Sequence, residues 1–309
     1  MSRGLDREGN DRVEKSDSQS RMSLSPGRAG GGGETEDDRA DRPQGGGLAR
    51  SEQRTLTHER EQVRYGRHRY EWSPTEQAVI REVGRFRTLD EQDVERVFYP
   101  SNPKQFRADL EHLSKQGLVL RRSVSVGKKG EIRRVVVLSK RAKRLAQHHR
   151  LAPEGQAVYA GFVKPAEVSH DASIYKMYEV EAAGIEAAGG RVERVVLDFE
   201  FKKKIYGELN KKGDYGDLSY ARRQEDLAKL HELPMVDGKI SLPDLRIEYE
   251  TAEGERAHID LELPTENYRP AHMSQKLRAG FKIYGVNSTS RGRRAEWEGR
   301  ELTAEVLAL

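Results

Sequence analysis

The chain of 309 residues contains no cysteine, so disulfide bonds and thiolate metal sites are excluded. Hydrophobic residues make up 35% of the chain and charged residues 34%, and no apolar run is long enough to span a bilayer. This composition is too polar for one large core. We therefore expect part of the chain to be disordered, and we expect a cytoplasmic protein that does not associate with membranes.

Large apolar side chains are scarce in the first part of the chain, where the stretch "AGGGGETEDDRADRPQGGG" is typical. Such a segment buries too little apolar surface to offset the entropy that ordering costs. We predict a disordered tail over residues 1–70 with a basic end. We interpret that end as a solvated linker, and an arm lying along a DNA groove is the alternative.

Residues 71–150 show the pattern of a winged helix-turn-helix domain, with three short helices followed by a hairpin. Ser73 and Glu76 form a capping box at the first helix. The third helix carries an apolar stripe of Phe106, Leu110 and Leu113. Two runs rich in β-forming residues then flank the turn "GKKG". A basic helix closes the domain.

The charge of this domain predicts a polyanionic partner. Residues 101–150 contain 14 Lys and Arg against 3 Asp and Glu, a net charge of +11. Double-stranded DNA is the expected partner, and a solvated basic surface used for protein contacts is the alternative. The predicted DNA-binding residues lie at the start of the third helix, on the hairpin strands and at the hairpin turn: Lys104, Gln105, Arg107, Arg121, Arg122, Lys128, Lys129, Arg133 and Arg134.

A linker with two prolines is expected over residues 151–168, a second domain over 169–287 and a C-terminal extension over 288–309. The second domain opens with a helix in which Glu181 lies within an apolar stripe, while Glu179 points away. A buried carboxylate needs a metal, an arginine or a proton to compensate it, or is simply a hydrogen-bonded structural residue. The last helix is expected from Pro270, with Lys282 on its surface.

Carboxylates gather on one face of a predicted hairpin within residues 242–266, which contain 8 Asp and Glu against 2 Arg. Asp244 on the first strand and Asp260 and Glu262 on the second would face the same way. Oxygen ligands of this kind bind Mg²⁺ or Mn²⁺, and Lys276 on the following helix would stabilise charge on a phosphate. The alternative is a polar strand face exposed to solvent.

This order of elements resembles the restriction-endonuclease-like fold of PD-(D/E)xK nucleases, with Pro243 and Asp244 as the "PD". The lysine usual two residues after the second carboxylate is absent, because Pro264 stands there; a migrated lysine, Lys276, would replace it. The whole arrangement over 70–287 resembles the replication-relaxation family of plasmids and mobile elements. The matching stretches are "LSKQGLV", "HD" and "LPMVDGKISLPDLRI…AHIDLELPTENYRPAHMSQKLRAGFKIYG".

We therefore expect an α+β protein of two domains, in which a winged helix-turn-helix precedes an α/β restriction-endonuclease-like domain. The resemblance implies a DNA-binding protein of plasmid replication or transfer, with replication or transfer proteins as partners. Two functions stay open. The second domain either cuts or nicks DNA with Mg²⁺ or Mn²⁺, with Glu181 as an auxiliary carboxylate, or it is the degenerate nuclease-like part of a non-enzymatic regulator.

Overall fold

The computed structural model describes residues 59–126, 130–211, 219–264, 269–285 and 306–308. All of these belong to one compact unit, residues 44–309. The tail predicted over residues 1–70 lies outside the described residues up to position 58. Eight helices and several sheets make up the described part, which is a mixed α+β structure.

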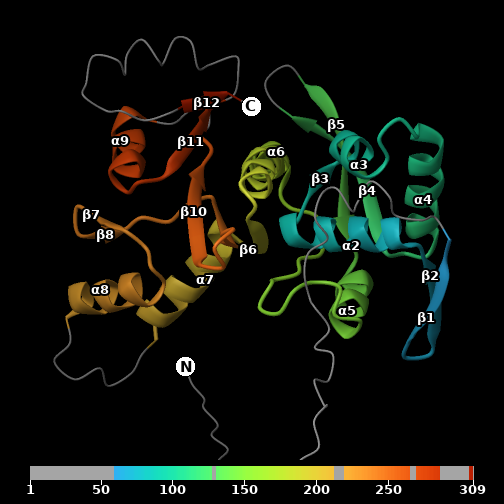
Figure 1. Ribbon diagram of the computed structural model, residues 1–309, viewed down its shortest axis with the longest axis horizontal. Coiled ribbons are helices and arrows are strands. Elements are labelled where there is room, and N and C mark those ends of the chain that lie inside the picture. The colour runs from blue at the N-terminus through green and yellow to red at the C-terminus, as the bar shows by residue number, and fades with distance from the viewer. Residues whose placement is uncertain (1–58, 127–129, 212–218, 265–268, 286–305, 309) are drawn as a thin grey trace, which may run out of the picture. The chain divides into compact units, whose positions relative to one another are not determined.

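A winged helix-turn-helix arrangement occupies the first part of the described chain (Figure 1). Its helices and strands follow in the order α2 (Pro74–Phe86), β3 (Leu89–Asp90), α3 (Glu91–Phe98), α4 (Pro103–Lys115), β4 (Val119–Val126) and β5 (Glu131–Leu138). The three strands form one sheet in the order β3-β5-β4, and both pairings are antiparallel. Helix α5 (Lys140–His148) continues from the end of β5.

The predicted local signals are found in these elements. Ser73 and Glu76 form both bonds of the capping box at α2. The stripe of Phe106, Leu110 and Leu113 is buried under α4. The wing strands β4 and β5 pair along their whole length, from Val119 with Leu138 to Val126 with Glu131. The turn residues Lys128 and Lys129 lie outside the described residues.

The prediction of a solvated linker at the basic end of the tail was wrong. Residues 61–72 form an antiparallel hairpin of β1 (Glu61–Tyr65) and β2 (His68–Trp72) instead of a solvated linker. Tyr70 and Trp72 are buried in the main hydrophobic core. Because these two aromatic side chains alternate along β2, one face of the hairpin is held on the winged helix. The sequence-based prediction missed this alternation because most of the neighbouring residues in the segment are charged or polar.

The second part is an αβ arrangement around a five-stranded sheet (Figure 1). Its order begins with α6 (Pro165–Ala187), β6 (Arg191–Leu197), α7 (Asp198–Leu209), α8 (Tyr220–Leu230), β7 (Met235–Val236) and β8 (Lys239–Ile240). It continues with β9 (Leu245–Glu250), β10 (Arg256–Glu262), α9 (Pro270–Arg278), β11 (Lys282–Gly285) and β12 (Val306–Ala308). Strands β7 and β8 form a separate small hairpin.

The large sheet has the order β12-β11-β10-β9-β6. β6, β9 and β10 are antiparallel neighbours, whereas β11 runs parallel to β10 after the α9 crossover. Without α7, α8 and the small hairpin, the chain order is helix, three antiparallel strands, helix and parallel strand. Strand β12 adds to the edge and pairs with β11, so part of the predicted C-terminal extension belongs to this sheet.

Two expected boundaries of this part are corrected. Helix α6 begins at Pro165, inside the predicted linker. The last helix ends at Arg278, and Gly280 with φ of 81° turns the chain into β11. The stretch from Lys282 therefore forms a strand of the sheet and not a helix face.

Helix α6 packs against α2, β3 and β4 of the winged helix-turn-helix on one side and against β6 and β9 on the other. Ile174, Tyr175 and Met177 join one continuous core with residues of both parts. This double burial corrects the prediction for Glu179. It does point away from the Glu181 face, but it is also buried, and Arg96 of α3 forms an ion pair with it.

Candidate functional site

Helix α4 presents cations on the side that faces away from the core. Asn102 caps the helix by accepting a hydrogen bond from the Gln105 backbone N–H at 3.2 Å, and Pro103 occupies its first turn. With Phe106 and Leu110 buried, the opposite face exposes Lys104 and Arg107. Neither of these two cations makes an ion pair within the described part of the chain. Both therefore keep their full charge for an external anion.

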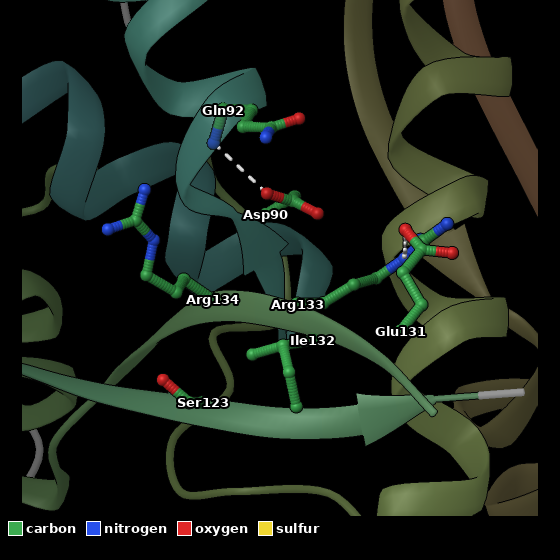
Figure 2. Close-up of a pocket in the computed structure, with 7 residues that line it drawn as sticks. All are labelled: Asp90, Gln92, Ser123, Glu131, Ile132, Arg133 and Arg134. Carbon is green, nitrogen blue, oxygen red and sulfur yellow. Dashed lines mark hydrogen bonds and ion pairs between the residues drawn. The ribbon is translucent and has the colours of Figure 1, made fainter. Parts of the chain in front are cut away.

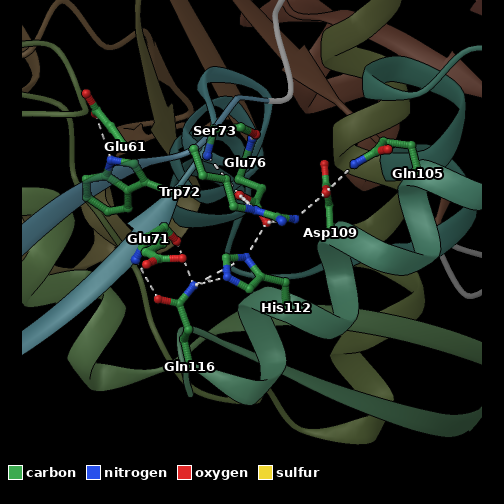
Figure 3. A network of polar contacts seen from close by, with 10 residues as sticks. Glu61, Glu71, Trp72, Ser73, Glu76, Gln105, Asp109, His112 and Gln116 are labelled. Carbon is green, nitrogen blue, oxygen red and sulfur yellow. Dashed lines mark hydrogen bonds and ion pairs between the residues drawn. The ribbon is translucent and has the colours of Figure 1, made fainter.

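Gln105 is held inside the protein, as Figure 3 shows. Its Nε2 donates to Asp109 Oδ1 at 2.6 Å, and the buried Asp109 also accepts from Arg60 Nη2 at 2.7 Å. Arg60 further donates to Glu76 Oε2 at 3.0 Å, which links the start of β1 to α2 and α4. This network orients the first turn of α4. It also means that one of the two Nε2 hydrogens of Gln105 is used inside the protein.

The wing arginines differ in how far they are neutralised. Arg121 donates to both carboxylate oxygens of Glu91 at 2.7 and 3.0 Å, and Arg134 Nε lies 3.7 Å from the same carboxylate. Arg122 is exposed and lies over the Phe162 ring at 5.4 Å. Arg121 is therefore mainly an internal partner of α3, whereas Arg122 and the exposed Arg134 remain candidates for phosphate contacts.

A cavity of about 310 Å³ lies against the half of β5 next to the wing turn, beside the start of α3 (Figure 2). Its lining comprises Asp90, Gln92, Ser123, Glu131, Ile132, Arg133 and Arg134. Arg133 lies beside Glu131, with its Nε 3.6 Å from the carboxylate. Since the two arginines of the lining are matched by two carboxylates, the cavity has no net charge that would select an anion.

The acidic end of the large sheet brings Asp244, Glu262 and Lys276 together. Asp244 directly precedes β9, and its backbone N–H donates to Leu261 on β10 at 3.1 Å. Its Oδ2 accepts from the Leu263 N–H at 2.9 Å. Lys276 Nζ on α9 lies 3.0 Å from Glu262 Oε2 and also donates to the Leu242 carbonyl at 2.5 Å. Lys276 on α9 therefore reaches the acidic end of the sheet.

Asp260 lies in a different environment. Arg246, directly opposite on β9, donates from Nε and Nη2 to the two Asp260 oxygens at 2.6 and 2.7 Å. The guanidinium also donates to the carbonyls of His231 and Glu232 at 2.8 and 2.9 Å and lies over the Phe201 ring. Arg246 is buried, and the side chain of Asp260 is largely shielded from solvent. Asp260 is therefore tied to a structural arginine, away from a shared ligand position.

Glu181 is compensated by a residue that was predicted to lie on the surface. Lys282 Nζ on β11 lies 2.6 Å from Glu181 Oε1, and the Tyr284 hydroxyl donates to the same oxygen. Burial, together with this bond to Glu181, raises the pKa of the Tyr284 hydroxyl. The prediction for Lys282 was wrong because β11 is a strand, which turns this side chain towards α6.

His170 joins the acidic end and was not among the predicted site residues. Its Nε2 lies 3.4 Å from Asp244 Oδ2, and its Nδ1 lies 3.7 Å from Asp171. Burial lowers the pKa of His170, but the bonds and charges of Asp171 and Asp244 outweigh it and raise the pKa to about 10. Arg87, which ends α2, contacts Asp171 at 3.3 Å. The "HD" pair in the sequence was the signal, but nothing local showed its partner.

These carboxylates do not fit the predicted Mg²⁺ or Mn²⁺ site. Asp244, Asp260 and Glu262 each face a different cationic side chain, namely His170, Arg246 and Lys276. No group of three or more His, Cys, Asp or Glu that could hold a metal ion is found in the described part of the chain. The metal site stays a prediction that gains no support from this arrangement.

Comparisons with known proteins add little. None of the helices in the described residues has the length and hydrophobicity that a membrane span requires. No family model and no curated protein matches the chain. Among solved structures, it is similar to the crystal structure of Bacillus subtilis PadR in complex with operator DNA, with 14% sequence identity over 52% of this chain and 93% of that chain. The TM-score of this match is 0.22.

Proposed function

We propose that this chain binds double-stranded DNA through α4 and the wing. The observation that carries the proposal is the exposed, unneutralised pair of Lys104 and Arg107 on the first turns of the helix that follows the turn of the helix-turn-helix. In this arrangement the second helix of the motif enters the major groove with its N-terminal residues, and the wing contacts phosphates. Among the exposed wing arginines, Arg121 is held by Glu91, so Arg122 and Arg134 are the ones we expect to contact phosphates.

Salt dependence tests this proposal. Each phosphate neutralised by Lys or Arg contributes about 0.9 to the slope of log K against log salt. Wild-type protein should bind duplex DNA with a steep slope, and Lys104→Ala/Arg107→Ala should lower its magnitude by about 1–2. A control with Gln62→Ala, exposed on β1, should match the wild type. An affinity that does not change with salt concentration would refute the proposal, and so would a double variant whose slope of log K against log salt equals that of the wild type.

For the second domain, the function that the side chains support best is a nuclease-like scaffold within a non-cleaving regulator. Each of the three expected metal carboxylates has a cationic neighbour, and Pro264 occupies the position of the usual lysine. The chain order of α6, β6, β9, β10, α9 and β11 supports the resemblance to the restriction-endonuclease-like fold. Taking part in plasmid replication or transfer is proposed on that resemblance alone.

Metal-dependent cleavage of DNA is the second candidate, and one contact favours it. Lys276 Nζ lies 3.0 Å from Glu262 Oε2, and Asp244 directly precedes the neighbouring strand β9, so the lysine is at the sheet end where a migrated lysine would be needed. Supercoiled plasmid incubated with the protein and Mg²⁺ or Mn²⁺ separates the two candidates. The regulator proposal expects the plasmid to stay intact. Nicking that Asp244→Ala and Lys276→Met both abolish would overturn it in favour of a nuclease.

A further inference from the structure

A second basic surface lies outside α4 and the wing. It consists of the tip of the β1–β2 hairpin and helix α5. The turn stretch "RYGRHR" over residues 64–69 contains three arginines and no acidic residue, and "SKRAKRLAQHHR" over 139–150 contains five Lys and Arg and no acidic residue. Six of these cations are exposed on the two elements: Arg64, Arg67, Arg69, Lys140, Arg141 and Arg144.

The hairpin and α5 form one continuous surface because they touch each other. His149 Nε2, just after α5, donates to the Arg64 carbonyl at 3.2 Å. The rings of Tyr65 and His148 lie 5.2 Å apart. Trp72 anchors the hairpin from beneath and contacts the His149 ring at 5.4 Å. The basic tip is thus seated on α5 by side chains that carry no negative charge.

The charges of this surface are not balanced within the protein. Arg64 lies directly opposite Arg69 in the antiparallel register of β1 and β2. Like charges in directly opposite positions destabilise a strand pair. In the described part of the chain, none of the six cations makes an ion pair. Elsewhere in the same chain exposed lysines and arginines are regularly paired, as Lys115 is with Glu111. A surface that keeps this repulsion is suited to an external polyanion.

The surface is also too far from the wing to serve the same phosphates. Strand β5 runs for eight residues from the wing turn to the start of α5, and a strand rises about 3.3 Å per residue, which is roughly 25 Å in all. Glu131, at the wing end of β5, and α5 therefore lie at opposite ends of this strand (Figure 1). A partner of the α5 side must be a separate stretch of polyanion.

We propose that the β1–β2 tip and α5 bind a second stretch of nucleic-acid phosphate backbone, separate from the stretch at α4 and the wing. This inference rests on the proposed function, since it extends the contact of the same protein with DNA. The recognition is electrostatic and independent of sequence, because these exposed cations contact phosphates and no base-reading element is required. Three phosphate contacts by the hairpin arginines would contribute about 2.7 to the magnitude of the slope of log K against log salt.

The test measures fluorescence anisotropy of a labelled duplex of random sequence over a range of KCl concentrations. The variant Arg64→Ala/Arg67→Ala/Arg69→Ala should reduce the slope by about 2–3 and weaken binding by 10- to 100-fold at physiological salt. The α5 variant Arg141→Ala/Arg144→Ala should reduce the slope by up to about 2. Both should melt at or above the wild-type temperature, because like-charge repulsion is removed.

The matched control is Lys203→Ala/Lys239→Ala/Arg256→Ala, which removes the same number of exposed charges from the second domain. Its slope should stay close to that of the wild type. A hairpin variant that behaves like this control would overturn the inference. If only the hairpin variant loses slope and Lys104→Ala/Arg107→Ala does not, the inference stands and the proposed role of α4 fails. If only Lys104→Ala/Arg107→Ala loses slope, the proposed role of α4 stands and the inference fails. Tighter binding of an acidic peptide than of DNA at this surface would also overturn the inference.

Discussion

Removing the Asp260 carboxylate distinguishes a structural ion pair from a metal ligand by the sign of its effect. In the structure little of the pair meets solvent, with the Arg246 side chain 4% and the Asp260 side chain 9% exposed. Asp260→Ala would leave the guanidinium with two backbone carbonyls as its remaining hydrogen-bond partners. Breaking a buried pair by removing one partner costs about 3–5 kcal/mol. The two carbonyls offset part of this, so we expect the free energy of unfolding to fall by about 3 kcal/mol.

The assay is thermal and urea unfolding in EDTA and in Mg²⁺. For a unit of this size, about 1 kcal/mol corresponds to a change in Tm of roughly 2–4 °C, so Asp260→Ala should lower the Tm by roughly 6–12 °C. The loss should be the same with and without Mg²⁺. The control Glu248→Ala removes a carboxylate from the same sheet whose side chain is 38% exposed and lies 3.7 Å from Arg194. It should lower the free energy of unfolding by about 1 kcal/mol or less.

The refuting result is equally definite. If Asp260 belonged to an uncompensated acidic cluster waiting for a metal, its removal would relieve repulsion between carboxylates. The metal-free variant would then be as stable as the wild type or more stable, and Mg²⁺ would stabilise the wild type alone. Either observation would show that the bond between Arg246 and Asp260 does not hold this end of the sheet.

Three further predictions concern other parts of the fold. His170 has its pKa raised to about 10 in the folded protein, against about 6.5 for an unfolded histidine, so the folded state binds an extra proton between these values. The stabilisation of the folded protein by His170 is therefore complete below about pH 6.5 and is lost as the pH rises towards 10. Urea titrations should show that the free energy of unfolding of the wild type falls over this pH range, and that it falls less steeply in His170→Gln. Trp72→Ala should lower the free energy of unfolding by about 3–5 kcal/mol, measured by urea unfolding with circular dichroism. The control Gln62→Ala, at an exposed position of the same hairpin, should have little effect. If Trp72→Ala is as stable as the wild type, the hairpin is not part of the core. Gly190→Ala should lower the free energy of unfolding by about 1–3 kcal/mol, because the new Cβ would come within 2.9 Å of the Glu250 carbonyl and of Ile185. Gly207→Ala on α7 adds a Cβ that meets nothing within 4 Å, so it should raise the free energy of unfolding by up to about 1 kcal/mol. A Tm that changes in the same direction in both variants would contradict this packing.

Local patterns in the sequence predicted most of the elements. The capping box of Ser73 and Glu76, the stripe of Phe106 and Leu110 and the alternation of β9 and β10 all appear where the residues indicated them. These features depend on neighbours within about one turn or one strand, so residue order is sufficient to specify them. The β1–β2 hairpin was missed because its few buried aromatics stand among charges, and the composition of the segment outweighed their spacing.

The sequence by itself determined which side chains share a face, and it placed Asp244, Asp260 and Glu262 together on one side of the hairpin. Only the tertiary structure decided what each carboxylate meets. Arg246 comes from the facing strand, Lys276 from the crossover helix, and His170 from a helix more than 70 positions earlier in the chain. A strand pattern contains no information about cations brought from elsewhere. Because opposite charges neutralise each other at these distances, the same three carboxylates that suggest a metal site in sequence act as ion-pair partners in the fold.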